Sequence, residues 1–171
     1  MKNFSIPFGK EKITFSLPDE QVAGVLLSHA HEYKAPKLVA DALANPIGSP
    51  KLSELAKGKK TCTIISSDHT RPVPSHVIMP QLLAELRKGN PDIAITILIA
   101  TGMHRPTTHE ELVAKYGKEI ADHETFVIHD SRKDEDMVSI GTLPSGGECL
   151  INKAAAHTDL LIAEGFIEPH F

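Results

Sequence analysis

A buried-strand pattern that turns abruptly polar is the feature that most constrains the fold of this chain. The run T-C-T-I-I-S at residues 61–66 is typical of a buried strand, and a polar cluster with two prolines follows it up to residue 74. The cluster holds a carboxylate, an imidazole, a hydroxyl and a guanidinium: Asp68, His69, Thr70 and Arg71. Each proline fixes its own φ and keeps the preceding residue extended. Because open α/β sheets bind ligands outside the carboxyl ends of their strands, this stretch is predicted to be a ligand-facing loop.

The same transition from an apolar strand to a polar loop recurs along the chain. The run I-A-I-T-I-L-I-A at residues 93–100 gives way to T-G-M-H-R-P, and a helix with Thr107 or Thr108 as its N-cap is expected to follow. Further elements are predicted as follows: strands at residues 125–130, 137–143 and 160–166, and a helix at residues 76–88. Strands that alternate with helices over about 110 residues predict an α/β fold with a Rossmann-like, mostly parallel sheet and helices on both faces.

Right-handed crossovers between parallel strands bring the carboxyl ends of the strands to one edge of the sheet. Three polar segments are therefore expected to meet at that edge: residues 66–71, 101–111 and 165–171. Upstream of the sheet, residues 2–18 alternate apolar and polar side chains around Gly9 and predict a β-hairpin extension at positions 1–18. Residues 35–57 predict two helical pieces, the second of which ends at Gly58.

Composition and charge exclude several classes of protein. A length of 171 residues predicts one domain, or one domain with a small appendage. The net charge of −4 and the absence of a basic run predict that the chain has no nucleic-acid partner. The longest apolar run, residues 93–100, is too short to span a bilayer, and the N-terminus lacks a signal-peptide core, so no membrane association and a cytoplasmic location are expected. Cys62 and Cys149 are expected to be buried free thiols in a reducing compartment.

The residues at the strand ends suit the recognition of a small anion combined with proton transfer. Arg71 and Arg105 carry planar guanidinium groups that can bind a carboxylate or a phosphate through two hydrogen bonds. His104 and His170 can take up or release a proton near neutral pH. Asp68 could orient an arginine or a histidine. This set of groups suits general acid–base chemistry on a hydroxy or keto acid.

Simpler interpretations of these residues stay open. Arg71 could tie down its own loop through an ion pair, and His104 could cap a helix N-terminus. The remaining histidines of the ten in the chain are expected to be mostly structural or solvated, with His129 at a strand end left open. No H-E-x-x-H motif or other tight metal-ligand spacing is present in the sequence. We therefore predict no metal site built from this chain alone.

Three separated segments resemble the nickel-pincer-nucleotide-dependent lactate racemase family, and they occur in the same order as in that family. They are S-D-H-T-R-P-V-P-S at residues 67–75, A-T-G-M-H-R-P-T-T-H-E-E-L at residues 100–112 and G-F-I-E-P-H-F at residues 165–171. The upstream stretch N-P-I-G-S-P-K-L-S-E-L-A-K-G at residues 45–58 is similar to the same family. The resemblance extends over nearly the whole chain. It implies an isomerase of two domains that interconverts the stereoisomers of a 2-hydroxy acid such as lactate.

The resemblance also implies a role for each matching residue. His104 and His170 look like the catalytic acid/base pair on opposite sides of the reacting carbon. Arg71 and Asp68 look like substrate-binding residues, with Arg71 on the carboxylate; Asp68 and Thr70 are further candidates for binding the cofactor. That cofactor is implied to be a nickel-pincer nucleotide, a pyridinium-derived mononucleotide that carries nickel. It would accept a hydride from the carbinol carbon and return it to the other face of a planar keto acid.

In the family, a glycine-rich segment with a cofactor-attaching lysine and a further nickel-binding histidine follow the E-P-H motif. In this sequence those positions lie beyond Phe171. The resemblance therefore implies that residues 1–171 are the N-terminal catalytic half of a two-domain enzyme, whose C-terminal domain is its partner. We expect the chain alone to bind no nickel cofactor and to be inactive. Two other hypotheses stay open: a metal-independent hydroxy-acid enzyme, and a nucleotide- or anion-binding module.

Overall fold

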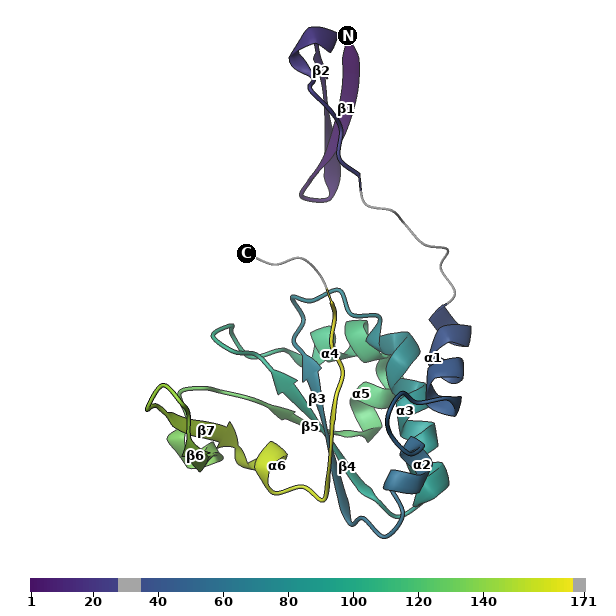
Figure 1. Ribbon diagram of the computed structural model, residues 1–171, viewed down its shortest axis with the longest axis vertical. Helices are drawn as coiled ribbons and strands as arrows, with labels where there is room; N and C mark the ends of the chain where they lie inside the picture. The colour runs from purple at the N-terminus through teal and green to yellow at the C-terminus, as the bar shows by residue number, and fades with distance from the viewer. Residues whose placement is uncertain (28–34, 168–171) are drawn as a thin grey trace. The chain divides into compact units, whose positions relative to one another are not determined.

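The computed structural model describes residues 1–27 and 35–167 of the chain, which divides into two compact units, Met1–Tyr33 and Lys34–Phe171 (Figure 1). The first unit contains the predicted hairpin. Strands β1 (Lys2–Phe8) and β2 (Glu11–Leu17) pair in antiparallel register around Gly9, whose φ of 60° lies in the region that favours glycine. No helix within the described residues is long and apolar enough to cross a membrane.

The second unit is built on a four-stranded parallel sheet, as the strand–helix alternation predicts. The strands are β3 (Thr61–Ser67), β4 (Ala94–Ala100), β5 (Thr125–Ile128) and β8 (Leu160–Ala163). Their order is β5-β4-β3-β8. The chain thus adds β4 and β5 on one side of β3 and places β8 on the other. A strand order that changes direction in this way marks the place where open α/β sheets bind ligands.

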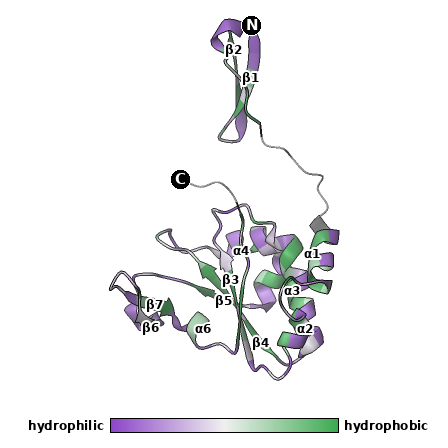
Figure 2. Cartoon of the chain, in the orientation of Figure 1, coloured by the Kyte–Doolittle hydropathy of each residue, from purple (hydrophilic) through white to green (hydrophobic). Residues whose placement is uncertain are grey.

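Most of the helices cover one face of the sheet, where the hydrophobic core lies (Figure 1). They are α1 (Ala35–Ala44), α2 (Leu52–Leu55), α3 (Ser75–Gly89), α4 (His109–Tyr116) and α5 (Lys118–His123). Ile64 of β3 and Ile97 of β4 are paired and fully buried, and Met79 and Leu86 of α3 pack against this face. Helices α1 and α3 show hydrophobic and hydrophilic colours around their turns, as expected for amphipathic helices (Figure 2).

The opposite face of the sheet is covered more thinly, by α6 (Lys153–Ala156). The Thr63 hydroxyl on this face donates to the carbonyl of Ala154, at 2.7 Å. Leu161 of the edge strand β8 points to the same face and is 51% exposed. The predicted fold class, an α/β sheet flanked by helices with an N-terminal hairpin, is confirmed.

One strand that was predicted for the parallel sheet belongs to a different sheet. Residues 137–143 were expected to continue the strand–helix alternation, but β6 (Met137–Thr142) pairs antiparallel with β7 (Glu148–Asn152) in a separate two-stranded sheet. The connection between β6 and β7 is far shorter than the dozen or so residues that a parallel crossover needs. Strand β6 also contains the polar Ser139 and the glycine Gly141, whereas a central parallel strand is apolar on both faces.

The segment between β4 and β5 begins as predicted and then breaks in two. Thr108 is the N-cap of α4, and its hydroxyl accepts from the backbone N–H of Glu111, whose carboxylate accepts from the N–H of Thr108. This reciprocal capping box is the one that the sequence pattern predicts. Gly117 separates α4 from α5 because its φ of 88° is incompatible with a continuous helix.

Candidate active site

The loops that follow β3 and β4 lie side by side at the carboxyl edge of the sheet, because Ser67 and Ala100 are paired at the ends of these strands. Asp68 is the first residue after β3, and its side chain is 2% exposed. One carboxylate oxygen of Asp68 accepts from the backbone N–H of Thr70 at 3.0 Å and from the Thr70 hydroxyl at 2.6 Å. The other oxygen lies 2.5 Å from Nδ1 of His104 in the second loop. Two of the three predicted strand ends are therefore in direct contact.

The second loop presents His104 through a tight turn. The backbone N–H of His104 donates to the carbonyl of Thr101 at 3.0 Å, and Gly102 between them has a φ of 58°. A positive φ at this position of a turn favours glycine. The His104 side chain is 48% exposed, in contrast with the buried carboxylate that it contacts.

The contacts of Asp68 determine how the two groups are ionised and oriented. Burial acts to raise the pKa of the Asp68 carboxyl, but the hydrogen bonds from Thr70 and His104 outweigh it and hold the pKa below its usual value. An ionised carboxylate can only accept hydrogen bonds, so Nδ1 of His104 carries the proton in this contact. Nε2 is then the ring nitrogen that is available for proton transfer with a ligand.

A pocket of about 380 Å³ opens at this edge, and we call it the sheet-edge pocket. Its lining includes Asp68, Arg71, Gly102, His104 and Glu164. The volume lies within the range of roughly 300–1,000 Å³ that is usual for small-molecule sites. The predicted anion-binding and proton-transfer residues, Arg71 and His104, therefore share one pocket.

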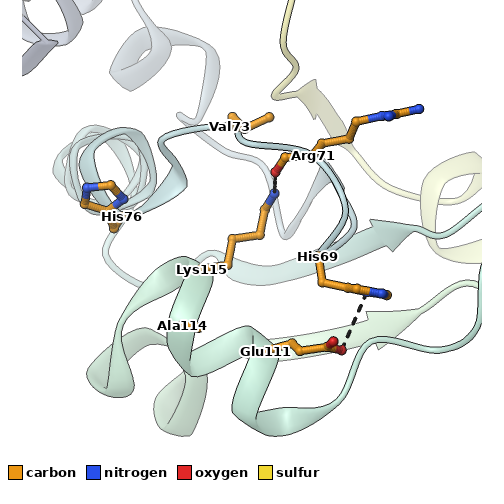
Figure 3. Close-up of a pocket in the computed structure, with 7 residues that line it drawn as sticks. All are labelled: His69, Arg71, Val73, His76, Glu111, Ala114 and Lys115. Carbon is orange, nitrogen blue, oxygen red and sulfur yellow. Dashed lines mark hydrogen bonds and ion pairs between the residues drawn. The ribbon is translucent and has the colours of Figure 1, made fainter. Parts of the chain in front are cut away.

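A smaller pocket of about 280 Å³ lies on the other side of the loop after β3, where α4 supports the loop (Figure 3). Lys115 of α4 points from the helix to the loop backbone in this view. Its ammonium donates to the hydroxyl of Ser67 and the carbonyl of Asp68, both at 3.1 Å, and to the carbonyl of Arg71 at 3.2 Å. Arg71 lines both pockets, so its loop forms the wall between them.

Two residues that are prominent in the sequence make contacts within the chain. Arg105 was expected to be a second anion-binding group, but its guanidinium forms two hydrogen bonds with the carboxylate of Glu111, at 2.9 and 2.5 Å. This pairing holds the pKa of Glu111 at about 2. Nδ1 of His69 lies 3.0 Å from the hydroxyl of Thr107 and 3.6 Å from Glu111. These contacts fit the structural role that the sequence predicts for His69.

A buried polar network lies beneath the sheet-edge pocket. The hydroxyl of Ser66 in β3 lies 2.7 Å from the hydroxyl of Tyr116 and donates to a carboxylate oxygen of Glu164 at 2.6 Å. Burial raises the pKa of the Tyr116 phenol, so this group stays protonated. The other oxygen of Glu164 is buried and has no hydrogen-bond partner among the described residues. Glu164 follows β8 directly, so the carboxyl end of β8 also contributes to the site.

No role is predicted from the sequence for Lys115 or Glu164, and Ser66 is placed in the polar segment without a prediction of its partners. The signal for Lys115 is its position on α4 next to the buried Leu112 and Tyr116, because a lysine on the inner face of a helix needs acceptors. The contacts of Ser66 and Glu164 join positions that are 98 residues apart and have no local signal.

Some predictions lie outside the part of the chain that the structure describes. His170, the second predicted acid/base residue, is one of them, and so are His29 and His31. Within residues 1–27 and 35–167, no group of three or more metal-binding side chains could hold a metal ion. At the end of β5, Nδ1 of His129 lies 3.3 Å from the side-chain amide of Asn152, which joins the separate β6–β7 sheet to the edge of the main sheet.

The geometry defines an α/β domain with a polar pocket at the carboxyl edge of its sheet, and comparison with known families assigns that domain. The family model described as the lactate racemase N-terminal domain matches residues 8–171. The chain belongs to this family.

Individual relatives agree with this assignment. The chain is 55% identical to the lactate racemase of Thermoanaerobacterium thermosaccharolyticum and 56% identical to that of Lactiplantibacillus plantarum, and each alignment covers 100% of the chain and 41% of the relative. It therefore spans well under half the length of these racemases. The solved structure of the lactate racemase apoprotein from T. thermosaccharolyticum matches with a TM-score of 0.91 at 54% identity, covering 99% of this chain and 40% of that one. A Thermotoga maritima protein with 20% identity and a TM-score of 0.54, covering 76% of this chain and 32% of that one, shares the fold alone.

Proposed function

We propose that this chain is the N-terminal catalytic half of an isomerase that interconverts the stereoisomers of a 2-hydroxy acid such as lactate. The observation that carries the proposal is the contact of 2.5 Å between Asp68 and His104 in a pocket that Arg71 also lines. An acid/base group and a cation suited to a carboxylate are the two groups that a hydroxy acid requires. Membership of the lactate racemase N-terminal family supports the same substrate class.

Each residue has a distinct task in this proposal. Arg71 binds the substrate carboxylate through charge-assisted hydrogen bonds. His104 accepts the proton of the substrate hydroxyl at Nε2, since Nδ1 is held by Asp68. The carboxylate of Asp68 stabilises the imidazolium that forms and keeps the ring oriented, as the aspartate of a catalytic triad does. His170 is the proposed acid/base partner on the opposite side of the substrate.

The described residues fit the organic part of a nickel-pincer nucleotide better than its metal. The sheet-edge pocket has the volume for a small-molecule site, and the exposed hydroxyl of Thr70 donates to Asp68 while its lone pairs remain available to a ligand. Asp68, which lines the pocket, and Thr70, which is hydrogen-bonded to Asp68 beside it, are thus the residues of this chain that we propose to face the cofactor. When bound, the nucleotide would supply the acceptor for the substrate hydride. The described residues include no cluster suited to hold the metal, so its ligands are proposed to come from the rest of the enzyme.

The whole enzyme is proposed to consist of this domain and a C-terminal domain that closes the site. The relatives have the length for such a second part, because the chain aligns with 41% of each. We propose a cytoplasmic location and a requirement for the C-terminal domain, so that residues 1–171 alone would be inactive. No nucleic-acid or membrane partner is proposed.

The decisive experiment measures the conversion of L-lactate to D-lactate by chiral chromatography, with the full-length protein produced together with its nickel cofactor. His104→Ala is expected to lower kcat by about 10²- to 10⁴-fold, the range of general acid–base catalysis. His109→Ala is the matched control, because His109 is the first residue of α4, five positions after His104, and pairs with Asp122 at the surface. Equal activity of the two variants would contradict the proposed role of His104.

A second arm of the experiment separates the two other hypotheses. Turnover of a hydroxy acid by residues 1–171 without nickel would favour a metal-independent enzyme. A regulatory anion-binding module would lose ligand binding on Arg71→Ala, and His104→Ala would leave its function intact. Loss of racemisation in both Arg71→Ala and His104→Ala supports the proposed isomerase.

A further inference from the structure

Lys115 makes three hydrogen bonds to one segment, although the proposed mechanism gives it no task. Its acceptors are the hydroxyl of Ser67 and the carbonyls of Asp68 and Arg71. An ammonium group has three N–H donors, and here each has an acceptor. Two of these acceptors lie in the loop that carries the proposed anchor of the substrate carboxylate, and the third, Ser67, is the strand residue directly before it.

The turn from Asp68 to Arg71 is also held by the Asp68 carboxylate, which accepts from the backbone N–H of Thr70 at 3.0 Å. The backbone N–H of Arg71 donates to the carbonyl of Asp68 at 3.4 Å, which is a long hydrogen bond. Lys115 contacts the carbonyls at both ends of this turn, so it fixes the distance between them. Figure 3 shows the Lys115 side chain reaching the loop backbone from α4, while the side chain of Arg71 extends away from it.

The surroundings of Lys115 favour a permanent contact. Leu112 and Tyr116 flank it on α4, and both are buried. Burial lowers the pKa of the Lys115 ammonium, and the negative charges of Glu164 and Asp68 oppose this effect. If the Lys115 side chain left the inner face of α4, its stem would be exposed and two loop carbonyls would lose a charged donor.

We propose that Lys115 is a positioning residue, which holds the segment at residues 67–71 in the conformation that presents Arg71 to the substrate carboxylate. The effect that we expect Lys115 to have on catalysis rests on the proposed function of the site. The residue does not contact the substrate in this proposal and acts through Arg71. If Lys115 only stabilised the fold, the effect of its substitution on catalysis would not depend on the presence of Arg71.

The first test measures amide hydrogen exchange in the full-length protein and requires no catalysis. In Lys115→Met, the amides of Thr70 and Arg71 are expected to exchange at least about tenfold faster than in the wild type, because the turn opens more readily. Lys118→Met is the matched control, since Lys118 pairs with Asp122 at the surface. Unchanged exchange at both amides in Lys115→Met would overturn the proposal. If that variant does not fold, Lys115→Arg is measured in the same way, because a planar guanidinium cannot direct its donors to the same three acceptors.

The second test is a double-mutant cycle on kcat/KM for lactate. Lys115→Met alone is expected to lower kcat/KM by about 10-fold or more, mainly through KM, and to cost less than about threefold when Arg71 is already alanine. Equal losses in both backgrounds would show a general structural role and overturn the proposal. If the wild-type protein does not racemise any 2-hydroxy acid, the proposed function fails, and the exchange experiment still decides the role of Lys115.

Discussion

The loops after β3 and β4 have similar sequences and use their charged residues differently. Each follows a parallel strand, and each contains a histidine and an arginine directly before a proline, in H-T-R-P and H-R-P. In the first loop Arg71 lines the sheet-edge pocket, whereas in the second Arg105 is paired with Glu111. The histidines are reversed: His104 of the second loop reaches the pocket and His69 of the first contacts Thr107.

Position after a strand therefore does not decide the contacts of a charged residue. Glu111 lies on the first turn of α4, within reach of Arg105, and it also caps that helix. Helix α3, which follows the first loop, has no acidic residue in its first turn. The neighbouring helix therefore contributes to the difference between the two arginines, and four predictions test the contrast.

The largest expected effect comes from the two His–Asp pairs. Asp68→Asn is expected to lower kcat about 10³-fold, because the amide donates to Nδ1 of His104 and moves the imidazole proton to Nε2, where the base is needed. Asp122→Asn alters the surface pair with His109, 3.1 Å apart, and is expected to leave kcat within about twofold. The measurement is racemisation by the full-length enzyme. Comparable losses in both variants would show that the Asp68–His104 pair has no special role.

The next effect compares the two arginines directly. Arg71→Ala is expected to lower kcat/KM for lactate by about 100-fold, which corresponds to the loss of charge-assisted hydrogen bonds worth about 3 kcal/mol. Arg105→Ala removes the same side chain from the other loop and is expected to change kcat/KM by less than about threefold. Steady-state kinetics on the full-length enzyme measure both. A larger loss for Arg105→Ala would reverse the assignment of the anion-binding residue.

A smaller effect concerns the dependence of stability on pH. The pKa of Asp68 is lowered in the folded state, so its ionised form stabilises the fold above the pKa of the unfolded chain, about 3.9, and this contribution is lost as the pH falls through the lower folded value. The difference in unfolding free energy between the wild type and Asp68→Asn should shrink as the pH falls below about 4. Urea unfolding at each pH measures it. A difference that grows as the pH falls from about 4 to about 2 would contradict the assigned direction of the shift.

The smallest effect tests how the two loops lead into their helices. Thr108 caps α4 with its side chain, whereas the N-cap of α3 is Pro74, which makes no side-chain hydrogen bond. Thr108→Ala is expected to destabilise the chain by about 1 kcal/mol and to lower Tm by roughly 2–4 °C. Thr158→Ala is a control at a half-buried position of the same unit, where the hydroxyl makes only long hydrogen bonds of 3.2 and 3.4 Å. An equal or larger loss in the control would argue against the cap as the cause.

Much of the fold could be predicted because its signals are local. The alternation of side chains in the N-terminal hairpin, the apolar run of β4 and the capping box at Thr108 each lie within a few residues of sequence. The β6 strand was placed in the wrong sheet because a single strand carries no signal for its partner. Only the short connection to β7 and the polar residues of β6 favour the antiparallel pair over the parallel sheet.

The candidate site could be predicted in part. The polar segments after β3 and β4 were expected to meet, and the contact between Asp68 and His104 confirms that they do. The proposed roles of these residues and of Arg71 stay predictions, as does that of His170. Lys115 and Glu164 were not anticipated, since their partners lie 47 and 98 residues away along the chain.

The strands, the helices and the polar character of the strand ends follow from local sequence, because hydrophobic periodicity and turn chemistry act over short distances. The pairing of Asp68 with His104, 36 residues away, and the set of residues that line the sheet-edge pocket follow from the packing of distant segments. Arg71 and Arg105 both stand directly before a proline, but Arg105 has Glu111 six residues further along, on the first turn of α4, whereas the first turn of α3 has no acidic residue. A buried charge requires a partner, and the partner is supplied by whichever segment the fold brings within reach.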